Sequence, residues 1–188
     1  MTVSFASSFM RNCLAGAALL ASVSPVAFAQ EPQVGGVLIY GRGADSVSLD
    51  PGKETDGESL NVADNIFDTL VQFKRGTTEI EPALAESWTI SDDKKTYTFK
   101  LRQNVKFHDG TPFNADAVIF SYMRQHDPKH EAYGYAKSWS YWGDMGMTTL
   151  VKGITKTDDH TVKFELAQPE APFLANMAMS FAAVVSPT

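Results

Sequence analysis

Cysteine, clusters of basic residues and long apolar runs are all scarce in this sequence, and each scarcity excludes a class of protein. The single cysteine, Cys13, leaves no partner for an intramolecular disulfide. Lys and Arg number 16 against 22 Asp and Glu, without a basic cluster, which argues against nucleic acid as a partner. The apolar stretch 13–23 is too short to span a bilayer. We therefore expect an acidic, soluble globular protein.

The first residues are typical of an export signal. Arg11 precedes the apolar stretch, and Ala27-Phe28-Ala29 forms the small-x-small pattern that signal peptidase accepts. We expect residues 1–29 to be a signal peptide that is cleaved after Ala29. Because Arg11 is the one charged residue in that segment, its removal takes the formal net charge from −6 to −7. Cys13 lacks the Leu and small residues that precede the cysteine of a lipoprotein, so we expect no lipid anchor.

Short strand and helix patterns alternate along the rest of the chain and predict a mixed α/β or α+β fold. We expect a loop over 43–59 because this segment is rich in Gly, Asp, Ser and Pro. The expected elements are a buried strand over 36–42, a helix from Ser59 to about Leu70, hairpins over 86–102 and 154–166, a short strand at 105–107, a helix capped by Asn114, a short helix over 173–179 and a strand over 181–185.

No catalytic motif is convincing. The chain has neither a GxSxG elbow nor a complete phosphate-binding loop, and its acidic pairs lie at expected turns, where Asp is favoured for structural reasons. His126 and His130 are four residues apart, which is a metal-ligand spacing, but Pro128 between them interrupts a helix. We therefore expect no enzyme, no metal site and no cofactor. The aromatic residues of 133–142 fit either a ligand or partner surface or core packing under a long loop.

Several motifs together resemble one family of transport proteins. The run ALAESWTISDDKKTYTFKLRQNVKFHDG at 83–110, followed by TPFNADAVIFSY, is similar to the signature region of family 5 extracellular solute-binding proteins. These proteins serve ABC importers of dipeptides, oligopeptides and nickel. SVSLDP at 46–51, TDDHTVKFEL from Thr157 and PEAPFLANMAM from Pro169 agree with this resemblance, and KRGTTE at 74–79 favours the dipeptide-binding members.

The resemblance implies a type II periplasmic-binding fold, in which two lobes close on a ligand by a hinge motion. It implies that residues 30–57 begin lobe I, that 58–181 form an extra domain inserted in that lobe, and that 182–188 return to it. The chain stops directly after the apolar run 181–185, which needs strand partners, so we expect a fragment that lacks lobe II and most of lobe I.

The resemblance also implies a function and a site. We expect a monomeric periplasmic receptor that captures small peptides for the permease subunits of an ABC importer. A carboxylate of Asp56 or Glu58 fits a peptide ammonium, although Asp56 equally fits a helix cap. The residues expected to face the ligand are Gly43, Ala44, Asp45, Ser46, Asp56, Gly57 and Glu58.

Three alternatives remain open from the sequence. Another cargo of the same family, such as glutathione, haem, nickel or a sugar, would use the same fold, because fold does not determine substrate. A truncated, nonfunctional product is compatible with the end of the chain. A secreted hydrolase domain would need a pair of acids or a nucleophile in a cleft, and the sequence has no such set.

Overall fold

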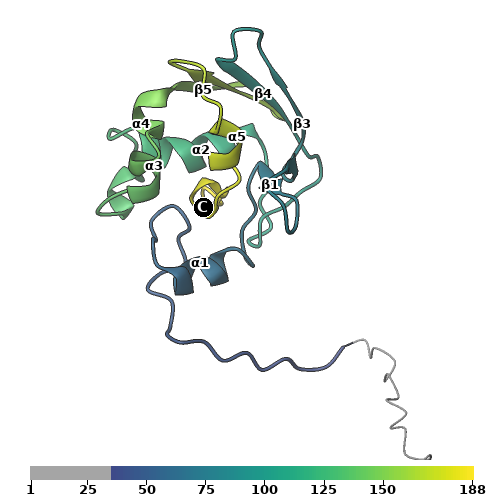
Figure 1. Ribbon diagram of the computed structural model, residues 1–188, viewed down its shortest axis with the longest axis vertical. Helices are drawn as coiled ribbons and strands as arrows, with labels where there is room; N and C mark the ends of the chain where they lie inside the picture. Colours follow the sequence, from purple (N-terminus) through teal and green to yellow (C-terminus); the bar gives the residue numbers. More distant parts are fainter. Residues whose placement is uncertain (1–34) are drawn as a thin grey trace, which may run out of the picture. The chain divides into compact units, whose positions relative to one another are not determined.

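The computed structural model describes residues 35–188, so the expected signal peptide and its cleavage site lie outside the described residues. The chain divides into a first unit that ends at Tyr40 and a second that extends from Gly41 to Thr188. The second unit contains the helices and strands labelled in Figure 1.

A four-stranded antiparallel sheet is the centre of the second unit, with strand order β3-β4-β6-β5. Its strands are β3 (Ala85–Ile90), β4 (Thr96–Leu101), β5 (Val151–Asp158) and β6 (Thr161–Leu166). β4 buries Tyr97, Phe99 and Leu101, and β6 buries alternate apolar residues in the same way. Both hairpins predicted from period-2 alternation are therefore confirmed.

Helix α2 (Ala115–His126) packs against this sheet. The side chain of Asn114 accepts a hydrogen bond from the amide of Ala117 at 3.0 Å, which confirms Asn114 as the N-cap. Tyr122 on the helix meets Phe164 of β6 edge to face, with ring centroids 5.3 Å apart. The helix ends at His126, two residues before Pro128, as expected from the exclusion of proline from helix interiors.

The first helix is shorter than predicted. Helix α1 covers Gly57–Ala63 only, because the chain leaves the helix at Asp64 and turns through Asn65 instead of continuing to Leu70. Leu70 is fully buried, but it precedes a two-stranded antiparallel sheet of β1 (Val71–Phe73) and β2 (Ile80–Pro82) that the sequence did not predict. Of the apolar positions that predicted this helix, Ala63 and Leu70 are buried, whereas Leu60 and Phe67 are only partly buried, so the spacing identified part of the core and the wrong helix end.

Three predicted strands are not formed as such. Residues 36–42 pair with no strand among the described residues, and Val37, Leu38 and Ile39 are exposed. Since a strand needs hydrogen-bonded neighbours, this segment stays irregular. The strand at 105–107 is reduced to one bridge between Lys106 and Pro112. The segment 181–185 begins with the 3-10 turn η2 (Ser180–Ala182) and makes one bridge, between Ala183 and Thr69.

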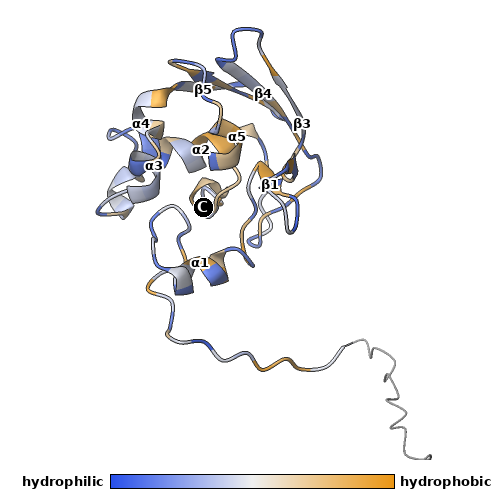
Figure 2. Ribbon diagram, in the orientation of Figure 1, coloured by the Kyte–Doolittle hydropathy of each residue, from blue (hydrophilic) through white to orange (hydrophobic). Residues whose placement is uncertain are grey.

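Short helices cover the remaining chain and close the core. They are η1 (Tyr133–Tyr135), α3 (Ser140–Asp144), α4 (Met147–Leu150) and α5 (Phe173–Asn176), the last a shorter form of the predicted helix. Figure 2 shows apolar residues concentrated on α5 and β1, which contribute the buried Phe173 and Val71. Trp139 and Trp142 are also buried, so core packing is the correct interpretation of these two residues, while Tyr135 remains exposed.

Candidate functional site

The two segments predicted to face a ligand lie against each other at the start of α1. Arg42 joins them, because its Nη1 donates to the Ser46 hydroxyl at 3.1 Å and to the backbone carbonyl of Glu58 at 3.2 Å. The Ser46 hydroxyl also donates to that carbonyl at 3.4 Å. The structure therefore brings 43–46 and 56–58 together, although Ser46 and Glu58 are twelve positions apart in the sequence.

Gly43 allows the Glu58 carboxylate to lie close to the backbone. A Cβ atom built on Gly43 would lie 3.3 Å from Oε1 of Glu58, which is tighter than ordinary van der Waals contact. Gly43 and its neighbours Ala44 and Asp45 are exposed, and Glu58 is half-buried. An exposed glycine beside a carboxylate leaves backbone groups and one negative charge accessible from the same side.

Asp56 serves as the helix cap that the sequence allowed. Its Oδ1 accepts a hydrogen bond from the amide of Ser59 at 2.8 Å, and this bond is the main reason that the pKa of Asp56 is lowered from its ordinary value. Its Oδ2 is buried and has no hydrogen-bond partner among residues 35–188. Of the two carboxylates, Glu58 therefore has the geometry that is better suited to an incoming cation.

The remaining residues of the set are open to solvent. Gly57 is the exposed first residue of α1. Asp45 lies 3.7 Å from Arg42 in an ion pair whose carboxylate side is fully exposed. Such a pair adds little stability, because water and salt screen it. The Asp45 carboxylate can therefore leave Arg42 and pair with another cationic group.

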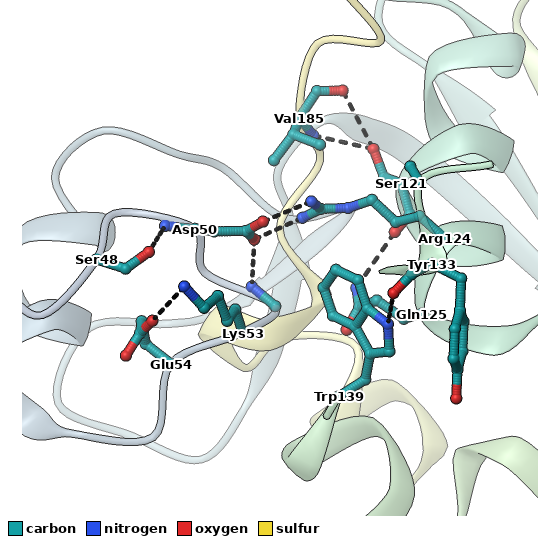
Figure 3. A network of polar contacts seen from close by, with 12 residues as sticks. Ser48, Asp50, Lys53, Glu54, Ser121, Arg124, Gln125, Tyr133, Trp139 and Val185 are labelled. Carbon is teal, nitrogen blue, oxygen red and sulfur yellow. Dashed lines mark hydrogen bonds and ion pairs between the residues drawn. The ribbon is translucent and has the colours of Figure 1, made fainter. Parts of the chain in front are cut away.

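A polar network holds the loop that carries these residues, and sequence reasoning missed its centre (Figure 3). Asp50 and Arg124, 74 positions apart, form two parallel hydrogen bonds of 2.6 and 2.7 Å. The Arg124 guanidinium also lies 5.0 Å from the centre of the Trp139 ring. Arg124 is 4% exposed, so this charge is almost completely removed from water and paired. SVSLDP contains Asp50, but nothing local identifies Arg124 as its partner.

Helix α2 holds the C-terminal segment through the same face. The Ser121 hydroxyl accepts a hydrogen bond from the amide of Val185 at 2.9 Å. The Tyr122 hydroxyl donates to the carbonyl of Ala182 at 2.7 Å. The side-chain amide of Gln125 donates to the carbonyl of Phe181 at 3.0 Å. One helix therefore joins the 46–54 loop and the 181–185 segment.

The two histidines that have a metal-ligand spacing pack against different aromatic rings. His126 lies against Trp142, with ring centroids 5.9 Å apart, and burial lowers its pKa. His130 packs edge to face on Phe120 and accepts the amide of Ala132. Within residues 35–188 no group of three or more His, Cys, Asp or Glu side chains could hold a metal ion.

A cavity of about 490 Å³ lies beside α1, apart from the predicted residues. Leu60, Phe67, Phe73 and Met179 are among its apolar lining, and Asp64 lies at it while accepting a hydrogen bond from Ser180. None of the seven predicted residues lines this cavity. In the described part of the chain, no helix has the length and apolar character needed to cross a membrane.

Comparison with known proteins gives a consistent result. The profile of the bacterial extracellular solute-binding proteins, family 5, matches residues 79–187. Di/tripeptide-binding protein 1 of Pseudomonas aeruginosa is 41% identical over an alignment of 181 residues, which covers 92% of this chain and 32% of that protein. Heme-binding protein A of Haemophilus influenzae is 43% identical over 74% of this chain and 27% of its own length.

A solved structure agrees in fold. The ABC transporter-associated periplasmic binding protein of Helicobacter pylori, in complex with the peptide STSA, superposes with a TM-score of 0.70. It is 50% identical and is matched over 77% of this chain and 30% of its own length. The chain thus spans about a third or less of the length of each of these relatives.

Proposed function

We propose, since the chain belongs to family 5 of the bacterial extracellular solute-binding proteins, that it is the N-terminal part of a receptor that captures small peptides for an ABC importer. The observation that carries this proposal is the meeting of 43–46 and 56–58 around an accessible carboxylate, on a chain similar to peptide-binding relatives. The receptor acts by closing on its ligand and performs no catalysis.

We further propose how the chain is divided. Residues 30–57 and 182–188 belong to lobe I, and 58–181 form the extra domain inserted between them. The hydrogen bonds from α2 to both flanking segments support this division, because they fix the extra domain to the two ends of lobe I that the chain contains. Export through the signal at 1–29 places the receptor in the periplasm, where it works as a monomer beside the permease subunits.

Within the site, Glu58 receives the ammonium group of the peptide. Charge-assisted hydrogen bonds between a carboxylate and an ammonium are among the stronger polar contacts. Asp56 contributes by fixing the first turn of α1 through its bond to Ser59, and Gly43 to Ser46 present backbone groups to the peptide.

A matched pair of ligands tests the role of Glu58. The protein expressed from the complete reading frame is titrated calorimetrically with a dipeptide and with its N-acetylated form, before and after Glu58→Gln. We expect the substitution to weaken dipeptide binding by about tenfold, the effect of 1.4 kcal/mol, and to leave binding of the acetylated peptide unchanged. If the substitution weakened binding of both ligands equally, the peptide ammonium would bind at a residue other than Glu58.

Haem is a second candidate cargo, because a haem-binding relative is as similar in sequence as the peptide-binding ones. Thermal unfolding distinguishes haem from a peptide as the cargo. The protein is first freed of bound ligand and is then unfolded in the presence of dipeptides, tripeptides, glutathione or haem. A ligand that binds the folded state raises the midpoint of unfolding. We expect dipeptides or tripeptides to raise it and haem to leave it unchanged. The opposite result would replace the peptide by haem.

A further inference from the structure

We propose that Arg124 is a positioning residue for the ligand site, acting through Asp50 on the segment 43–58. This inference rests on the proposed function, because it assigns Arg124 a part in binding that requires this segment to face the ligand. Its physical basis is the network in Figure 3, in which a buried guanidinium on α2 holds a carboxylate of the loop.

The loop has little else to hold it in place. From Gly41 to Thr55 it contains no helix or strand, and its apolar residues Val47 and Leu49 are 77% and 47% exposed. Pro51 is the buried exception, and a segment with no helix or strand and a single buried apolar side chain has low local stability. Its placement therefore depends on polar contacts, among them those of the Ser59 hydroxyl with the amides of Val47 and Ser48.

Asp50 is the residue through which one contact fixes many atoms. Its carboxylate accepts the amide of Gly52 at 3.1 Å as well as both nitrogens of Arg124. Its backbone carbonyl accepts the amides of Lys53 and Glu54, and its own amide donates to Ser48. Holding this carboxylate therefore fixes the turn over 48–54 that separates the two ligand-facing segments.

Arg124 is itself held rigidly. It belongs to α2, is 4% exposed, and lies over Trp139, whose indole nitrogen donates to the carbonyl of Tyr133 at 3.0 Å. The planar guanidinium gives two parallel hydrogen bonds, and a lysine cannot reproduce this geometry. The neighbouring Gln125 lies against Gly52 and adds a second contact from the same helix turn.

Loss of the Arg124–Asp50 pair would leave the loop attached near α1 and through the packing of Gln125 on Gly52, without a hydrogen bond from α2 to Asp50. Gly43 to Ser46 would then occupy a range of positions, and a ligand would have to order them on binding. That ordering costs affinity even though neither Arg124 nor Asp50 touches the ligand. A role in fold stability alone would lower the unfolding midpoint without changing the affinity of the folded protein.

The test uses the protein expressed from the complete reading frame, with Asp50→Asn and Arg124→Lys as variants. Arg124→Lys keeps the charge and serves if the unpaired Arg124 of Asp50→Asn prevents folding. Asp116→Asn is the matched control, because it removes a carboxylate in the first turn of α2 that pairs with Lys156 of β5. Dipeptide affinity is measured by calorimetry at a temperature where every variant is folded, and amide hydrogen exchange is followed over 43–58.

We expect Asp50→Asn and Arg124→Lys to bind the dipeptide at least about tenfold more weakly, a loss of about 1.4 kcal/mol. We also expect the amide hydrogens of 43–58 to exchange faster in both variants. Added ligand should restore protection of this segment, and Asp116→Asn should behave as the unaltered protein. Unchanged exchange over 43–58, or faster exchange with unchanged affinity, would overturn the inference. Absence of dipeptide binding by the unaltered protein would contradict the proposed function instead, and exchange alone would then decide whether Arg124 positions the loop.

Discussion

Substitution of Gly52 by alanine is expected to destabilise the chain through one contact. A Cβ atom on Gly52 would lie 2.9 Å from Cδ, 3.0 Å from Oε1 and 3.1 Å from Nε2 of Gln125. The backbone of Gly52 does not have a positive φ, so alanine adds no backbone strain there. Gln125 is 2% exposed and donates hydrogen bonds to the carbonyls of Ser121 and Phe181, which oppose its movement.

Two estimates of the cost agree. Overpacking of a filled interior costs about 1–3 kcal/mol. If Gln125 moves away instead, it gives up two hydrogen bonds worth about 0.5–1.5 kcal/mol each, or about 1–3 kcal/mol together. We therefore expect Gly52→Ala to lower the free energy of unfolding by about 1–3 kcal/mol.

Urea unfolding followed by the fluorescence of the buried tryptophans measures this change. Gly134→Ala is the control, because Gly134 is exposed, lacks a positive φ and has nothing within 4 Å of the added atom, so its effect should stay within about 0.5 kcal/mol. A double-mutant cycle with Gln125→Ala isolates the contact. If Gly52→Ala costs as much in the Gln125→Ala background as it does with Gln125 present, the reasoning is refuted.

Two further predictions concern the attachment of the C-terminal segment. Tyr122→Phe removes the hydroxyl that donates to the carbonyl of Ala182 inside the core. Because the buried carbonyl loses its donor, we expect the free energy of unfolding in the same urea assay to fall by about 1–3 kcal/mol. No measurable fall would mean that water reaches that carbonyl. Hydrogen bonds from Ser186, Thr111 and Thr188 lower the pKa of Asp109 below its ordinary value of 3.8. A carboxyl whose pKa is lowered in the folded state contributes stability above pH 3.8, and this stability is lost as the pH falls through the folded-state pKa. The unfolding midpoint should therefore fall less steeply between pH 5 and pH 2 in Asp109→Asn than in the unaltered protein. Equal slopes in the two proteins would contradict this prediction.

The sheet and α2 could be predicted from the sequence because their signals are local. Phe99 and Phe164 lie in runs of strict alternation bounded by turn residues, and Asn114 is a strong N-cap before a helical apolar pattern. The strands β1 and β2 have three residues each, too short for a period to show. The helix predicted to reach Leu70 was wrong because Leu70 shares the helical spacing but is buried from an extended segment.

The site could be predicted only in part. The resemblance pointed to 43–46 and 56–58, and the structure shows these segments in contact, but their role toward a ligand stays a prediction. Arg124 could not have been found from the sequence, because a charged residue on the buried face of a helix carries no local mark of its partner 74 positions away. Its partner and its burial follow only from the packing of α2 on the 46–54 loop.

Calorimetric titration of the protein from the complete reading frame with a dipeptide tests the central claim most directly. We expect saturable binding of one dipeptide per protein. We also expect a negative heat-capacity change on binding, because closure of two lobes buries apolar surface. Absence of heat with every dipeptide and tripeptide tried, from protein freed of bound ligand and shown to be folded, would contradict the claim that this chain is part of a peptide receptor.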